Sequence, residues 1–121
     1  MLVGVCLHFL NYAQPKSDHL DIGDKAPDIK PYKWIKGSPI KEFKKGQIYL
    51  VEFGATWCKP CVEAIPEMTA LANDLKDKVT VASIFVMEHN TKPPEEIPDY
   101  LKRVQTYVEK KGDAIGYAIA V

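Results

Sequence analysis

Two cysteines, Cys58 and Cys61, lie two residues apart in the segment EFGATWCKPC (52–61), and this spacing allows three kinds of chemistry. The pair can help to bind a metal ion, form a structural disulfide, or exchange electrons as a dithiol and disulfide. The 121 residues contain one other cysteine, Cys6, and three histidines, none in a second paired motif, so a four-ligand zinc site is disfavoured. A structural bridge across so short a loop constrains little chain entropy. The spacing therefore favours redox exchange.

The residues around the pair predict a turn from a strand into a helix. The run IYLVEF (48–53) is typical of a strand buried on both faces. From Lys59 to Lys76 apolar residues recur at helical spacing, with Pro60 in the first turn and Pro66 inside, where it is expected to kink the helix. Cys58 thus precedes a helix, whose unpaired N–H groups and positive dipole end stabilise a thiolate. We expect Cys58 to be the attacking sulfur.

The neighbours of Cys58 suggest how an exchange would finish. Cys61 follows three positions later on the same side of the predicted helix, close enough to displace a mixed disulfide. Lys59 adds a positive charge that favours the thiolate, and Pro60 stiffens the ring that the disulfide closes. Trp57 is expected to shield the site and to offer a flat apolar surface to a substrate chain, with a core position as the alternative.

Glu52 interrupts the apolar run of the first strand and is a third candidate for catalysis. A carboxylate on a central strand is costly to bury and therefore needs a route to solvent or a task. We expect it to take and return the proton of Cys61 through water, with its pKa raised by desolvation. The alternative is a glutamate at the strand edge that reaches solvent.

The rest of the chain predicts an α/β domain with a mainly parallel sheet and flanking helices. Residues 20–46 are rich in glycine and proline, which indicates an N-terminal extension of short strands and turns. VTVASIFVM (79–87) predicts a second strand, and an amphipathic helix begins at Ile97 and ends near Gly112. GYAIAV (116–121) begins a third strand. This alternation of strands and helices favours right-handed crossovers.

Residues 1–19 are predicted to be a leader, followed by one partial domain over residues 20–121. The apolar run from Leu2 to Leu10 and the small Ala13 after it match a signal peptide or an anchor fragment. A run of this length is too short to span a bilayer as a helix. Cys6 is interpreted as a hydrophobic leader residue. The leader suggests an extracytoplasmic protein, with possible membrane association.

The charge balance excludes one class of partner. Sixteen basic and sixteen acidic residues cancel, and 46% of the residues are apolar, as in a globular protein. No basic stripe is present in the sequence, so nucleic acid is not an expected partner.

The segment VEFGATWCKPCVEAIPEM (51–68) resembles the active-site strand, turn and kinked helix of the thioredoxin superfamily, in particular its TlpA-like thiol-disulfide oxidoreductases of bacterial envelopes. In this resemblance Glu52 matches the buried acid and Pro66 the helix kink. IGDKAPDI (22–29) is similar to the N-terminal entry of that branch. The likeness covers roughly residues 20–121 and implies a thioredoxin-like fold.

The resemblance also implies a function. It predicts an enzyme that reduces or exchanges disulfides in exported proteins, and that cycles between dithiol and disulfide at Cys58 and Cys61 without a bound cofactor or metal. The implied partners are protein dithiols or disulfides and an upstream thiol reductant. A peroxidase is disfavoured, because Ala55, Thr56 and Trp57 do not fit the residues expected before a peroxidatic cysteine.

The chain departs from the family pattern at several points. Gly54 stands where an aromatic residue is usual, which is expected to loosen packing beside the site, and Ala64 stands where many relatives carry an acid. The family fold continues with a helix, a cis-proline, a hairpin and a last helix, whereas no proline follows the strand at 116–121. We therefore expect a truncated, incomplete fold in which an edge of strand 48–53 is uncovered.

The alternative function is a non-catalytic binding module of the same fold, which holds a partner or copper. Met87 and His89 would be the metal candidates beside the cysteines, although a strand-end methionine and a loop histidine are more often core and solvated residues. Stoichiometric copper binding that is lost in Cys58→Ser would favour this alternative.

Overall fold

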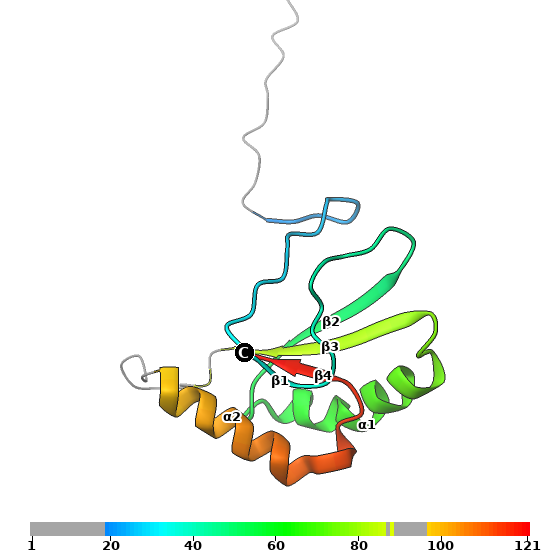
Figure 1. Cartoon of the computed structure of the whole chain (residues 1–121). Helices are drawn as coiled ribbons and strands as arrows, with labels where there is room; N and C mark the ends of the chain where they lie inside the picture. The colour runs from blue at the N-terminus through cyan, green and yellow to red at the C-terminus, as the bar shows by residue number, and fades with distance from the viewer. Residues whose placement is uncertain (1–18, 87, 89–96) are drawn as a thin grey trace, which may run out of the picture.

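The computed structural model describes residues 19–86, 88 and 97–121, and in this part of the chain it contains a four-stranded sheet (Figure 1). The strands are β1 (Trp34–Lys36), β2 (Ile48–Gly54), β3 (Val79–Phe85) and β4 (Ala118–Ala120), and the helices are α1 (Lys59–Asp74), α2 (Ile97–Lys111) and a 3-10 turn (Gly112–Ala114). The strand order is β1-β4-β3-β2, with β2, β3 and β4 parallel and β1 antiparallel to β4. The expected α/β class with a mainly parallel sheet is confirmed.

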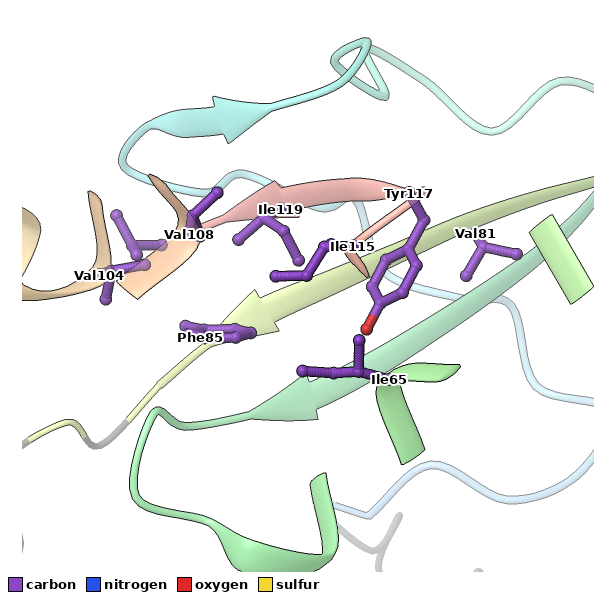
Figure 2. Close-up of a cluster of buried hydrophobic side chains, with 9 residues drawn as sticks. Ile65, Val81, Phe85, Val104, Val108, Ile115, Tyr117 and Ile119 are labelled. Carbon is purple, nitrogen blue, oxygen red and sulfur yellow. The ribbon is translucent and has the colours of Figure 1, made fainter. Parts of the chain in front are cut away.

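Both helices cover the same face of the sheet, and the main core lies between them and the strands (Figures 1 and 2). Ile65 of α1 and Val104 and Val108 of α2 are buried against side chains of β3 and β4. Ile119 of β4 is wholly inaccessible to solvent. Two adjacent parallel strands such as β3 and β4 need a crossover connection, which α2 provides here. The amphipathic pattern of α2 gives this helix the apolar face that packs on the sheet.

The N-terminal segment covers part of the opposite face. Ile40 is buried there against the small side chains of Ala82 and Ala118, with partly buried aromatic residues around it. The chain turns directly after β1 at Gly37, which has a φ of +73°. A Cβ atom at Gly37 would lie 2.8 Å from the Cα atom of Ala118, so the turn packs backbone to backbone on β4.

β2 is an edge strand of the described sheet, and the expectation of a strand buried on both faces is wrong. It pairs with β3, and no described strand pairs with its other side. Ile48, Leu50 and Phe53 are 61%, 37% and 65% exposed. A run of apolar residues predicts a strand, but it does not tell where that strand lies in the sheet.

The ends of three elements differ from the sequence-based bounds. α1 ends at Asp74 rather than Lys76, with the N–H of Leu75 still donating to the carbonyl of Leu71. β3 ends at Phe85, two residues before the predicted end, and Met87 lies outside the described residues. β4 is shorter than the run 116–121. Pro66 lies inside α1, as the sequence predicted.

Candidate active site

Cys58 and Cys61 form a disulfide at the turn from β2 into α1. Their Cα atoms are 5.3 Å apart, within the usual range for a disulfide. β2 ends at Gly54, and the N–H of Cys58 donates to the carbonyl of Ala55 at 3.1 Å, which closes a tight turn before α1 begins at Lys59. Both sulfurs therefore lie where the sequence placed them, at the carboxyl end of a strand and the N-terminus of a helix.

Cys58 is the N-cap residue of α1. Its backbone is extended, and its Sγ atom accepts the N–H of Cys61 at 3.3 Å. Pro60 lies in the first turn, where a backbone N–H would have no partner within the helix, so the proline costs no hydrogen bond. The first turn of this helix carries no acidic residue. The sulfur of Cys58 is thus held at the N-terminus of a helix whose own first turn does not offset the positive potential there.

The side chains of Lys59 and Trp57 reach solvent. Lys59 is 85% exposed at its side chain, and its Nζ atom lies 3.8 Å from the Oε1 atom of Glu63. An exposed pair of this kind is screened by water and salt, which weakens the effect of the lysine charge on the thiols. Trp57 is 49% exposed, so it lies on the surface beside Cys58 rather than enclosed in the core.

Gly54 and Glu52 lie on the face of β2 that faces the helices. A Cβ atom at Gly54 would lie 3.6 Å from the Cβ atom of Cys61 and 3.8 Å from Cε1 of Phe85, which is ordinary van der Waals contact. The sequence predicted loose packing beside Gly54. The ring of Phe85 from β3 lies next to this position in the structure. Glu52 is on the same face two residues earlier, roughly 6.6 Å along the strand. The strand therefore directs Glu52 and Gly54 toward the side where Cys61 lies.

Glu52 is partly buried and hydrogen-bonded. Its Oε2 atom accepts the hydroxyl of Ser83, its cross-strand partner in β3, and Ser83 is wholly buried. Burial raises the pKa of the Tyr117 phenol, a hydrogen bond with Ser83 lowers it, and the charge of Glu52 raises it further. Glu52 of β2, Ser83 of β3 and Tyr117, directly before β4, thus form a small polar cluster under the helices.

Glu88 is a buried carboxylate near the site that the sequence analysis missed. It is 2% exposed, its Oε1 atom accepts the N–H of Thr56 at 2.6 Å, and its Oε2 atom accepts the hydroxyl of Thr56. The sequence offered one signal for it. Glu88 follows the second parallel strand closely, and the carboxyl ends of adjacent parallel strands meet at the same sheet edge as the cysteines.

Several sequence-based candidates lie outside the described residues. Cys6, Met87 and His89 belong to this group, so the copper alternative has no described metal ligands beyond the cysteine pair. Within residues 19–86, 88 and 97–121, no three histidine, cysteine, aspartate or glutamate side chains come together as a metal site. The same part of the chain contains no helix with the length and hydropathy of a membrane span, and residues 1–18 of the predicted leader are not described.

The chain is similar to curated proteins over part of their length. It is 42% identical over 53 residues to protein FixW of Rhizobium leguminosarum, which is 44% of this chain and 23% of FixW. It is 36% identical over 63 residues to the thioredoxin-like protein YneN of Bacillus subtilis, or 51% of this chain and 36% of YneN. It is 28% identical over 103 residues to the thiol-disulfide oxidoreductase ResA of Bacillus thuringiensis, or 83% of this chain and 58% of ResA. The chain thus spans less than two thirds of these relatives.

A comparison with solved structures gives no significant match. The family model described as Thioredoxin matches residues 39–100, which is half of the chain. The matched region includes β2, the turn with both cysteines, α1 and β3. The chain therefore belongs to the thioredoxin family.

Proposed function

We propose that the chain is a thiol-disulfide oxidoreductase that works through Cys58 and Cys61. The observation that carries this proposal is the position of Cys58 as the N-cap of α1, with its disulfide partner in the first turn. A thiolate is the nucleophile of disulfide exchange, and a helix N-terminus stabilises it. The thioredoxin family match and the name of the relative ResA agree with this chemistry.

The proposed reaction has two exchange steps. The thiolate of Cys58 attacks a substrate disulfide, which breaks, and one substrate thiolate leaves and takes up a proton. The sulfur of Cys61 then loses its proton and attacks Cys58 in the mixed disulfide, so the second substrate thiolate leaves and is protonated. The substrate gains two electrons and two protons, and the chain gains the Cys58–Cys61 disulfide.

Glu52 is the proposed proton acceptor for Cys61 in the second step, through a water molecule. It shares a face of β2 with Gly54, which lies under Cys61. Glu52→Gln is expected to slow the second step by about 100-fold at neutral pH, the lower end of general-base effects. Rapid-quench trapping with a model disulfide would show this as an accumulated mixed disulfide.

Glu63→Gln is the matched control for this test, because Glu63 is an exposed acid on the outer side of α1. It is expected to leave the rate and its pH dependence unchanged. An identical pH dependence of dithiol oxidation in Glu52→Gln and the unsubstituted chain would remove the proposed role of Glu52.

The proposed substrates are disulfides of exported proteins, as in the TlpA-like branch, with an upstream thiol reductant as electron source. Two half-exposed or exposed aromatic side chains, Trp57 and Phe53, flank the turn and can contact an extended substrate chain. The apolar run from Leu2 to Leu10 is the ground for proposing an extracytoplasmic location. The name of the relative ResA supports thiol-disulfide exchange as the class of reaction, but it does not name a substrate.

The function is tested by reduction of insulin with the pre-reduced chain. We expect each chain to reduce one insulin disulfide and to gain the Cys58–Cys61 disulfide, identified by peptide mass mapping. A chain in which both cysteines are replaced by serine serves as the blank. Free thiols at both positions together with no insulin reduction would refute the proposal.

A further inference from the structure

We propose that Glu88 is a positioning residue that holds the turn before Cys58 and thereby keeps the sulfur of Cys58 at the N-terminus of α1. This inference rests on the proposed function, because it concerns the same redox site. Both carboxylate oxygens of Glu88 accept hydrogen bonds from Thr56, one from the backbone N–H at 2.6 Å and one from the side-chain hydroxyl. Thr56 lies two residues before Cys58.

The turn depends on this contact. The N–H of Cys58 donates to the carbonyl of Ala55, so Thr56 and Trp57 are the two central residues of the turn. Ala55 is fixed by burial, whereas Thr56 is partly exposed and Trp57 lies on the surface. Glu88 therefore holds the turn at a position that core packing does not hold. A partly buried N–H without its acceptor would also carry a desolvation cost.

Glu88 is itself held in place from α2. Its carbonyl oxygen accepts Nη1 of Arg103 at 2.8 Å, and the hydroxyl of Tyr100 donates to the carbonyl of Phe85, at the end of β3. Side chains of α2 thus anchor the chain on both sides of residue 86. The backbone that presents the carboxylate to Thr56 is thus anchored by hydrogen bonds from α2, as a positioning residue requires.

Polar and charged side chains of α2 interact with Glu88. The groups that face it from α2 are Tyr100, Tyr107 and Arg103. Burial raises the pKa of both tyrosines, and the negative charge of Glu88 raises it further. A buried carboxylate is tolerated when hydrogen bonds satisfy it, and the two donors of Thr56 do so here.

The test compares Glu88→Ala with Glu88→Gln in the full chain. Alanine removes both acceptors, whereas the amide of glutamine can accept the N–H of Thr56 with its oxygen and donate to the hydroxyl of Thr56 with its nitrogen. Iodoacetamide alkylation of Cys58 in the reduced chain, followed peptide by peptide over pH 5–10, reports the thiolate. Both substitutions remove the negative charge of Glu88, and this removal by itself favours the thiolate, so the comparison between the two variants isolates the position of the sulfur. We expect Glu88→Ala to be alkylated about tenfold more slowly at neutral pH than Glu88→Gln, with its profile moved to higher pH, since a displaced sulfur loses the helix N-terminus.

Thr69→Val is the matched structural control. The hydroxyl of Thr69 donates to the carbonyl of Ala114 at 2.8 Å and accepts the N–H of Gly116 at 3.0 Å, far along α1 from the cysteines. Its loss is expected to lower the melting temperature without moving the alkylation profile of Cys58. If Glu88 had only a structural role, its replacement by alanine would likewise lower the melting temperature and leave the alkylation profile of Cys58 unmoved from that of Glu88→Gln.

Several outcomes would overturn the inference. A profile of Glu88→Ala that coincides with that of Glu88→Gln would do so. If Glu88→Ala does not fold, Thr56→Val removes the hydroxyl contact alone, and an unshifted profile there would overturn it too. Insulin reduction by the unsubstituted chain separates the two proposals: its presence with unshifted profiles refutes only the role of Glu88, and its absence refutes the proposed function and this inference together.

Discussion

Replacing Cys58 with serine is expected to abolish insulin reduction by the chain, because a serine hydroxyl is not ionised at neutral pH and cannot attack a disulfide. The proposed role of Cys58 as the nucleophile rests on its place as N-cap of α1, while Cys61 lies in the first turn. The loss should be complete within the sensitivity of the assay, since the thiolate is the nucleophile of the exchange. The rate of insulin reduction measures it.

Cys61→Ser is expected to behave differently from Cys58→Ser. The attack by Cys58 still occurs, but the mixed disulfide is not displaced, so a covalent complex with the substrate accumulates and is visible by mass spectrometry. Cys6→Ser is the control and should reduce insulin normally. Trapping of the substrate on Cys61 in the Cys58→Ser variant would reverse the assignment of the two sulfurs.

Gly37→Ala is expected to be the most destabilising of the glycine substitutions outside the active site. The positive φ of +73° disfavours an L-residue, and the added Cβ would lie 2.8 Å from the Cα atom of Ala118, which is backbone and cannot rotate away. Backbone strain and overpacking together predict a loss of about 3 kcal/mol in the free energy of unfolding. Urea unfolding followed by circular dichroism gives this value.

Gly46→Ala separates the two causes. Gly46 has a similar φ of +82°, but no atom lies within 4 Å of the position of its added Cβ. It should therefore lose only the conformational part, about 1 kcal/mol. Equal losses in both variants would show that the contact between the turn after β1 and β4 is not what requires glycine at Gly37.

The local parts of the fold and site could be predicted from the sequence. The apolar run at 48–53, the helical spacing after Lys59 and the two-residue gap between Cys58 and Cys61 are patterns within a few turns of chain. They place a disulfide pair at a strand-to-helix turn, and the structure shows this arrangement. Local hydrogen bonds and periodic burial determine such features, so sequence periodicity reports them.

The remaining features depend on contacts between distant residues. The exposure of Ile48 and Phe53 follows from the place of β2 at the edge of the described sheet, which is a property of strand order. Glu88 and Thr56 are 32 positions apart and meet only because β2 and β3 pair in parallel. No pattern around Glu88 alone distinguishes it from a solvated acid in a loop.

The double role of Cys58, as helix cap and as half of the disulfide, joins the redox couple to the folding equilibrium. The N–H of Cys61 donates to the Sγ atom of Cys58. This hydrogen bond and the field of the helix act differently on a thiolate and on a disulfide. In a thermodynamic cycle, the difference in unfolding free energy between the dithiol and disulfide forms equals the displacement of the reduction potential from that of the unfolded chain. Each 1.4 kcal/mol corresponds to about 30 mV. Denaturation curves of the dithiol and disulfide forms therefore show whether folding makes the cysteine pair a stronger donor or a stronger acceptor of electrons than it is in the unfolded chain.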